Sequence, residues 1–307
     1  MSKGLMFHHF HGQEHPVVQG SIDADSLSSM LDFVGLTNIL PAQDYYARVL
    51  AGALEPRHLC VTFDDTLLCQ YDIAKPVLDA LGITAFWFVY SSVLEGQKEW
   101  LEIYRIFRTR WFDDIDHFYG LFFARVESCY GIDYRRRHAR FDPRNYLPND
   151  PFYSDNDRWF RYLRDRFLDS ETYHRLMRDM LRDHQVDLEK ISKNLWMKVG
   201  QIQTLSQEGH LIGLHSHTHP TRLAALSAQA QQGEYDANYA AIEHITGKAP
   251  TTASHPCNSY NAETLRLLRD KGIRLAFRAD VADVENRSLL EMPRENHANI
   301  LRRMRQT

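Results

Sequence analysis

Hydrophobic runs alternate with amphipathic stretches along much of this 307-residue chain. Residues 59–63 (LCVTF) form an apolar run, a helical stretch follows as far as Leu81, and residues 83–90 (ITAFWFVY) form a second run after Gly82. Apolar runs separated by a helix are typical of a β-α-β unit, whose parallel sheet is covered on both faces. Functional side chains are expected at the C-terminal ends of such strands, where Asp64 and Asp65 lie.

The same alternation returns after Trp196. It predicts helices over 197–209, 227–246 and 261–272, a strand over 210–219, a short apolar run over 251–256 and a strand over 273–279. Both stretches are therefore assigned to one α/β domain spanning residues 1–307. Between them, Val93 to Leu195 is dense in charged and aromatic residues with helical periodicity, and this segment is predicted to be a helical insertion.

Composition excludes several classes of protein. The formal net charge is -4, so the chain lacks the overall basic balance of a nucleic-acid-binding protein. The longest strongly apolar run, residues 83–90, is far shorter than the roughly 20 residues of a membrane-spanning helix.

Histidines interrupt the N-terminal apolar stretch, so no export signal is expected. The four cysteines lack CxxC spacing, which argues against a disulfide framework and a cysteine zinc site. A soluble cytoplasmic protein fits these features.

Two adjacent carboxylates, Asp64 and Asp65, directly follow the apolar run 59–63. Taken alone, such a pair also fits a turn or the N-cap of the next helix. A second motif makes a functional interpretation more specific, because it supplies ligands that a metal ion prefers.

That second motif is HSHTHP, in which His215, His217 and His219 alternate at the end of an apolar strand. If the strand continues, the three imidazoles share one side, and Pro220 forces a break that can turn His219 inward. A surface cluster of histidines is the alternative. Two imidazoles and one carboxylate leave a divalent ion an open position for water and substrate. Such an ion activates water and polarises a carbonyl, and a second carboxylate can accept the water's proton.

The pair VTFDD and HSHTHP resembles the polysaccharide deacetylase family with the NodB homology domain, which is similar to carbohydrate esterase family 4. The similarity extends over most of residues 5–92 and 196–301, and the insertion lies outside it. The resemblance implies an α/β fold, a distorted, incomplete (β/α) barrel with a metal at its C-terminal mouth. It also implies hydrolysis of N-acetyl groups on a carbohydrate, with a saccharide or a sugar precursor of a surface glycan as substrate.

The resemblance assigns roles to the residues of both motifs. Asp64 matches the catalytic base, and Asp65, His215 and His219 match the metal ligands. His217 is then a spacer or a residue that supports the ligands from behind. Zn²⁺ is the expected ion, and Co²⁺ and Ni²⁺ are alternatives because carboxylate-imidazole sites accept several divalent ions.

Two departures from the family pattern concern the remaining catalytic groups. The family's Arg-x-Pro-Tyr motif is replaced by residues 254–258 (SHPCN), so Arg294 is the candidate for the arginine that orients the base; a surface ion pair is its alternative. The general-acid motif is also missing, and His297 is the nearest candidate, with a solvated terminal residue as the alternative. His8 and His255 are candidates for substrate contacts, and packing of a buried histidine is the competing interpretation.

The insertion carries Arg135, Arg136 and Arg137 among tyrosines and phenylalanines. Such a run is usually a solvated face, but guanidinium groups over a barrel mouth can clamp a phosphate or carboxylate while aromatic rings stack on a sugar or base. Two other functions stay open: hydrolysis of a non-carbohydrate C–N bond on the same scaffold, and a catalytically silent, metal-containing carbohydrate-binding protein. The sequence leaves a homo-oligomer open.

Overall fold

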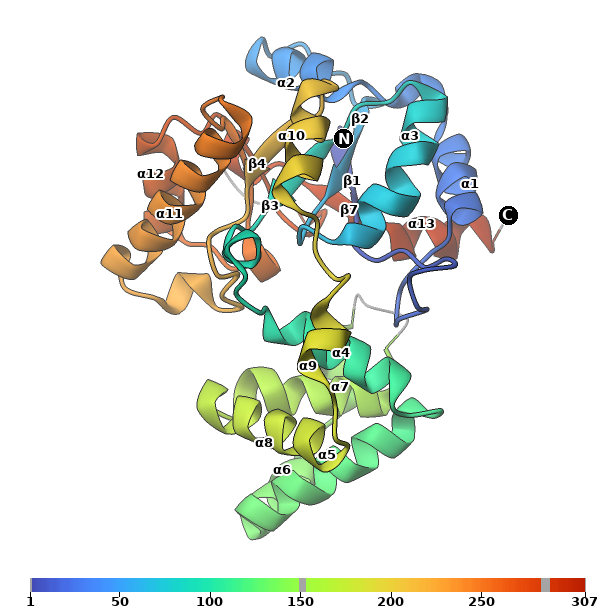
Figure 1. Ribbon diagram of the computed structural model, residues 1–307, viewed down its shortest axis with the longest axis vertical. Coiled ribbons are helices and arrows are strands. Elements are labelled where there is room, and N and C mark those ends of the chain that lie inside the picture. The colour runs from blue at the N-terminus through green and yellow to red at the C-terminus, as the bar shows by residue number, and fades with distance from the viewer. Residues whose placement is uncertain (1, 149–152, 283–287, 307) are drawn as a thin grey trace. The chain divides into compact units, whose positions relative to one another are not determined.

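The computed structural model describes residues 2–148, 153–282 and 288–306 and divides into two compact units (Figure 1). Unit 1 comprises Met1–Val17, Ser21–Glu99 and Asn194–Thr307, and unit 2 comprises Val18–Gly20 and Trp100–Lys193. Across these described ranges, no helix combines the length and the apolar character that crossing a membrane requires.

Unit 1 is built on seven parallel strands in the spatial order β6-β5-β4-β3-β2-β1-β7. The strands are β1 (Lys3–Phe7), β2 (Leu59–Phe63), β3 (Phe86–Val89), β4 (Leu211–Leu214), β5 (Thr252–Ser254), β6 (Leu275–Phe277) and β7 (Arg294–Asn296). Phe277 of β6 also bridges Met292, two residues before β7, so the two edges of the sheet nearly meet. The predicted distorted, incomplete barrel is confirmed.

Helices surround these strands (Figure 1). They are α1 (Ala24–Val34), α2 (Ala42–Leu50), α3 (Lys75–Leu81), α10 (Val199–Gln207), α11 (Ala228–Thr246), α12 (Ala262–Asp270) and α13 (His297–Met304). Asp23, Ser227 and Asn261 begin three of them by accepting a hydrogen bond from a backbone N–H of the first turn. These caps satisfy amides that the helix itself leaves unpaired.

Side-chain alternation along β3 separates the barrel interior from the layer under the helices. Phe86 and Phe88 belong to an inner cluster with Tyr45 of α2, whereas Trp87 and Val89 belong to the outer core. The backbone N–H of Ala42 in α2 donates to the backbone oxygen of Thr84, just before β3 begins. Helix α2 therefore covers the N-terminal end of the barrel, and the C-terminal ends of the strands are left to form a site.

The predicted strand over 210–219 is wrong in its second half. Strand β4 ends at Leu214, and the three histidines lie in the loop that follows. The backbone of Ser216 (φ 63°) and of His219 (φ 56°) is left-handed, which is incompatible with a continuing strand. The inward turn expected at Pro220 thus begins one residue after the first histidine.

Unit 2 is helical in its described part. Its helices are α4 (Trp100–Arg110), α5 (Ile115–Tyr130), α6 (Ile132–Arg140), α7 (Asp155–Tyr162), α8 (Ser170–Asp183) and α9 (Leu188–Ser192), with a π-helical turn, η5 (Leu163–Phe167), after α7. Phe107, Phe118, Phe122 and Phe160 are buried and meet edge to face, which suits aromatic pairs. Asp114 and the capping box of Ser154 begin α5 and α7.

Two buried histidines make the stability of the protein depend on pH. Burial lowers the pKa of His210 and of His255 to about 4, from the usual 6.5. Between about pH 6.5 and pH 4 these histidines are therefore protonated in the unfolded chain but neutral in the folded chain. Their contribution to stability is complete above pH 6.5 and is lost as pH falls toward 4. Between pH 7.5 and 5, each histidine should cost about 2 kcal/mol of unfolding free energy.

Urea unfolding at pH 7.5 and 5 tests this dependence. In the variant His210→Asn, the amide oxygen can still accept the 2.9 Å hydrogen bond from the backbone N–H of Ala85, and the loss at pH 5 should shrink. The matched change His244→Asn, on the exposed side of α11, should leave the loss unaltered. An unchanged pH dependence in the His210 variant would contradict the assignment.

Candidate active site

Asp65, His215 and His219 converge beyond the C-terminal ends of β2 and β4. The Oδ1 atom of Asp65 lies 3.4 Å from Nε2 of His215 and 3.3 Å from Nε2 of His219. One ligand atom from each residue lies within 4.8 Å of the others, which is the spacing of a group that can hold a metal ion. One carboxylate oxygen and two imidazole nitrogens are ligands that zinc accepts in three-ligand sites.

The backbone around these residues adopts uncommon conformations. Asp65 (φ 78°) and Thr66 (φ 59°) are left-handed, as are Ser216 and His219 in the histidine loop. The Thr66 hydroxyl accepts a 3.1 Å hydrogen bond from the backbone N–H of Tyr90, which ties the loop after β2 to the end of β3. Left-handed non-glycine residues cost free energy, and their concentration here is typical of functional sites.

Two hydrogen bonds fix the orientation of His215. Its Nδ1 lies 3.0 Å from the backbone oxygen of Ser254, and its backbone N–H donates to the amide oxygen of Asn238 on α11 at 2.9 Å. Because a carbonyl oxygen only accepts, Nδ1 carries the proton, and Nε2 is the ring nitrogen that faces Asp65. A hydrogen bond to the far nitrogen is how metal-binding histidines are usually oriented.

Arg294 is fully buried and holds Asp64 in a two-pronged ion pair. Its Nη1 and Nη2 donate to Oδ1 and Oδ2 of Asp64, both at 2.7 Å. The remaining donors reach the backbone oxygen of Arg278 at 2.6 Å, the hydroxyl of Ser254 at 2.7 Å and that of Thr62 at 3.4 Å. A surface ion pair, the alternative for Arg294, does not describe this arrangement.

The electrostatics of the site keep both aspartates ionised. Burial alone would raise the pKa of Asp64, but the Arg294 guanidinium and His215 outweigh it, and the pKa is lowered. Burial likewise opposes ionisation of Asp65, yet its neighbours His215, His219 and His8 lower its pKa well below the usual range. Asp64 is thus an unprotonated carboxylate beside the group of possible ligands.

His8 follows β1 directly and faces both aspartates. Its Nε2 lies 3.8 Å from Oδ2 of Asp64 and 3.9 Å from Oδ2 of Asp65, and its side chain is 26% exposed. Gln70 positions this corner, because its amide nitrogen donates to the backbone oxygens of His8 at 2.8 Å and Asp64 at 2.5 Å. His8 therefore has both proximity to the carboxylates and access to solvent.

The other predicted histidines lie outside the ligand group. His217 turns toward β3, with Nδ1 2.9 Å from the hydroxyl of Ser91. His255 is 1% exposed, donates from Nε2 to the backbone oxygen of Leu290 and stacks on Tyr260, so the structure gives it a packing position rather than an open face. His297 begins α13 and is buried.

The ring of His297 stacks on Phe7 of β1, with ring centroids 5.9 Å apart. The alternative of a solvated terminal residue is therefore excluded, since only 7% of the residue is exposed. Phe7 immediately precedes His8, so the two histidines are attached to neighbouring strands near the same end of the barrel.

The three arginines proposed as a clamp belong to unit 2, and they differ in their contacts. Arg135 is ion-paired with Glu127 at 2.9 Å. Arg137 donates to the hydroxyl of Tyr162 at 3.2 Å, and Arg136 is exposed. Only Arg136 and Arg137 line a common hollow.

Three residues that support the site were not found from the sequence: Gln70, Asn238 and Ser254. Each is buried, and each bonds to the backbone or side chain of a predicted site residue. The one signal that the sequence offers for Asn238 is an asparagine, a poor helix former, inside the predicted helix 227–246. Nothing in the sequence distinguishes Ser254 from other serines.

In a second group of possible ligands, formed by Asp79, Glu208 and His210, the negative charge of the carboxylates is already neutralised by a lysine. The ammonium of Lys75 lies 2.7 Å from a carboxylate oxygen of Asp79 and 2.7 Å from one of Glu208. A lysine between two carboxylates supplies the positive charge that a metal would bring, so this group is a structural ion-pair network.

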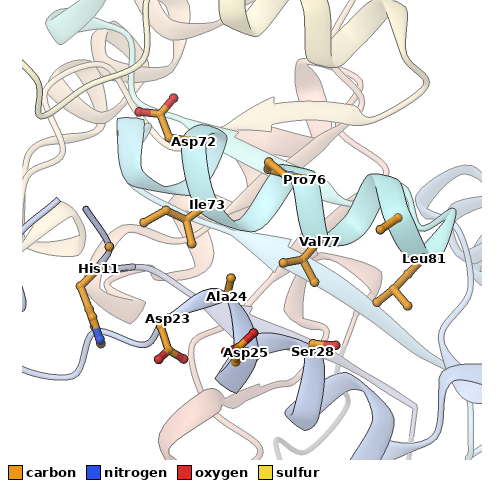
Figure 2. A pocket seen from close by; sticks show the side chains of 12 residues that line it. His11, Asp23, Ala24, Asp25, Ser28, Asp72, Ile73, Pro76, Val77 and Leu81 are labelled. Atoms are coloured by element: carbon orange, nitrogen blue, oxygen red, sulfur yellow. The ribbon is translucent and has the colours of Figure 1, made fainter. Parts of the chain in front are cut away.

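A hollow of about 600 Å³ lies between α1 and the helical segment formed by η2 (Gln70–Ala74) and α3 (Figure 2). Two of its three carboxylates serve local structure: Asp23 caps α1 by accepting from the N–H of Ser26 at 2.8 Å, and Asp72 pairs with His15 at 2.8 Å. Apolar side chains of Ile73, Val77 and Leu81 form its other side. The hollow is separate from the group formed by Asp65.

Comparisons with known proteins find a family match and a shared fold. The family model described as polysaccharide deacetylase matches residues 173–276, which include the histidine motif. The chain has the NodB-type fold of the polysaccharide deacetylase family. The resemblance to this family is thereby confirmed, but its predicted extent is not: the match does not reach Asp64 and Asp65, and it begins inside the segment 93–195 that was placed outside the similarity. A comparison with curated protein sequences finds no match.

Three solved structures illustrate the shared fold. Streptococcus pyogenes deacetylase PplD has 14% identity and a TM-score of 0.56, with 96% of this chain and 91% of that chain covered. IcaB from Ammonifex degensii has 16% identity and a TM-score of 0.55, covering 95% and 90%. A de-N-acetylase from Aggregatibacter actinomycetemcomitans has 13% identity and a TM-score of 0.55, covering 95% and 93%. At these identities the likeness concerns the fold.

Ser254 offers a direct test of how the Asp64–Arg294 pair is supported. Its hydroxyl donates to Oδ2 of Asp64 at 3.2 Å and accepts from Arg294. Ser254→Ala should lower the free energy of unfolding by about 1–3 kcal/mol, because a buried guanidinium N–H loses its acceptor. Thr252→Val is the matched control on the same strand, since the buried Thr252 hydroxyl has no hydrogen-bond partner in the described chain. Equal stability changes in the two variants would contradict this support.

Proposed function

We propose that this polysaccharide-deacetylase-like chain is a metal-dependent hydrolase that removes N-acetyl groups from a carbohydrate. The observation that carries the proposal is the arrangement of Asp64 beside the group formed by Asp65, His215 and His219. In this arrangement the ionised carboxylate of Asp64, held by Arg294, lies next to three residues that can bind a metal ion, within a fold shared with deacetylases.

The three residues fit a divalent ion by chemistry and spacing. Asp65 and both histidines present their ligand atoms to one another, and His215 is held with its Nε2 atom facing inward. Zn²⁺ is the ion we expect, with Co²⁺ or Ni²⁺ as substitutes. An ion held there supplies a Lewis acid that lowers the pKa of water and polarises an acetyl carbonyl.

The chain's own groups have distinct tasks in this proposal. Asp64 accepts the proton of the attacking water, and Arg294 keeps that carboxylate ionised and fixed in direction. The departing amine must receive a proton, and His8 and His297 are the two candidate donors. His8 is favoured on position, because its partly exposed ring approaches both aspartates.

Acetate release tests the proposal. The protein is loaded with Zn²⁺ and incubated with N-acetylglucosamine oligomers, acetylated sugar nucleotides and a cyclic ureide. We expect acetate and free amine in equal amounts from at least one sugar, and none with Asp65→Asn. Turnover of the ureide without turnover of any sugar would replace this function with the non-carbohydrate alternative. Retained metal without any turnover would indicate a silent binding protein.

A further inference from the structure

A hollow of about 790 Å³ lies on unit 2, beside the C-terminal half of α6. Three arginines of that helix, Arg136, Arg137 and Arg140, line it. Aromatic rings form much of the remaining wall, including Tyr162 at the end of α7 and Phe167 at the end of η5. The hollow therefore combines positive charge with aromatic surface.

The aromatic wall is ordered by ring contacts. The ring of Tyr162 lies 5.1 Å from that of Phe141 and 5.7 Å from that of Tyr146, measured between centroids. All three residues are half-buried, and the ring of Trp159 stacks on Tyr162 with centroids 5.3 Å apart, which leaves the other face of Tyr162 for a ligand. Accessible aromatic surface in a concave setting suits the apolar face of a sugar ring.

One of the three arginines is held in place by that wall. Arg137 donates to the hydroxyl of Tyr162 at 3.2 Å, and its guanidinium lies 6.0 Å from the centroid of Phe167. An anchored guanidinium loses less conformational entropy on binding an anion than a free one.

The other two arginines carry charge that the described chain does not balance. Arg136 and Arg140 are exposed, and among the described residues neither forms an ion pair. They stand four residues apart on α6, a spacing at which like charges repel. Elsewhere in unit 2, Arg125 pairs with Asp183 at 2.6 Å and Arg135 with Glu127 at 2.9 Å.

The two acidic residues at the hollow do not remove this surplus. Asp142 is occupied by Arg144, with both carboxylate oxygens 2.9 Å from guanidinium nitrogens. Asp133, in the first turn of α6, forms no ion pair within the described ranges, so its one negative charge offsets one of the three arginine charges and a positive surplus remains. Favourable placement of cations at a helix C-terminus is worth only about 0.3–1 kcal/mol and does not explain the aromatic wall.

We propose that this hollow binds a sugar ring that carries an anionic group, a phosphate or a carboxylate. Arg136 and Arg140 bind the anion, Arg137 completes the cationic side, and Tyr162 stacks on the ring. The choice of a sugar rests on the proposed function, whereas the binding of an anion does not. The predicted clamp thus becomes a site of unit 2 in which Arg140 takes the place of Arg135.

Calorimetric titration of the full-length protein tests the site. The protein is kept in chelator, so that binding is measured without turnover and a failure here is distinct from a failure of the proposed function. The probes are N-acetylglucosamine 1-phosphate, glucuronic acid, N-acetylglucosamine, inorganic phosphate and uridine monophosphate. We expect one of the two anionic sugars to bind more tightly than the neutral sugar and phosphate, which also tells phosphate from carboxylate.

The double variant Arg136→Ala/Arg140→Ala should weaken that binding by about tenfold or more. The matched control Arg175→Ala/Arg178→Ala changes the net charge equally on exposed positions of α8 and should stay within about twofold. Equal weakening of binding in both double variants would show that the protein's net charge alone causes the effect, and it would overturn the proposed site. Phosphate binding as tightly as the sugar phosphate, or uridine monophosphate binding more tightly, would overturn the assignment of a sugar.

Discussion

Replacing Asp64 with asparagine is expected to leave the metal bound and to lower kcat by about 10²–10⁴-fold. The amide fills the space of the carboxylate but cannot accept the proton of the attacking water. Asp64 lies outside the ligand group, 3.9 Å from Nε2 of His215 and paired with Arg294 instead. Metal analysis and steady-state kinetics on the same preparation check both parts of the expectation.

Ser254→Ala is the control for this experiment, because it removes one hydrogen bond to the Asp64 carboxylate and leaves the carboxylate itself in place. Its loss of kcat should be clearly smaller than that of Asp64→Asn. If Asp64→Asn keeps near-normal turnover with full metal occupancy, another residue is the base.

The second large effect is expected at the histidine motif. His215→Ala and His219→Ala should each abolish retention of the metal, since each removes one of three protein ligands. His217→Ala should retain it, because His217 points to Ser91 and not to Asp65. The three variants lie within five residues of one loop, so His217→Ala is a matched control for local disturbance.

Metal content after gel filtration, measured by atomic emission, distinguishes these outcomes. Circular dichroism of each variant establishes that the loss is not caused by unfolding. Equal loss of metal in all three variants would reject the ligand assignment, and retention in His219→Ala would require a different third ligand.

The parallel core of the fold could be predicted because its signals are local. Apolar runs such as 59–63 and 83–90, with a helix between them, correspond to β2, α3 and β3. The boundaries differ, because the run at 83–90 contains a strand only from Phe86 to Val89. Nor does periodicity alone reveal that β4 stops at Leu214, because left-handed backbone at Ser216 leaves no mark in an apolar pattern.

The candidate site was predictable where a motif or the family resemblance named its residues, Arg294 included, and not where only the fold brings a residue to the site. Asp65 and His219 belong to short motifs, and the structure places them 3.3 Å apart. Arg294 lies 230 positions beyond Asp64, so only the three-dimensional arrangement of β2 and β7 around β1 shows how they meet. Ser254 meets the same carboxylate across the barrel, and no local pattern distinguishes it.

The most direct test of the account is acetate release by the same protein stripped of metal and then reloaded. Wild-type protein is treated with a chelator, assayed on the acetylated sugar that gives the highest turnover, and assayed again after one equivalent of Zn²⁺ is added. The account predicts turnover lost on stripping and restored on reloading, with no restoration in Asp65→Asn. Turnover that persists in the stripped protein, or that returns in Asp65→Asn, would contradict a metal-dependent deacetylase built on Asp65, His215 and His219.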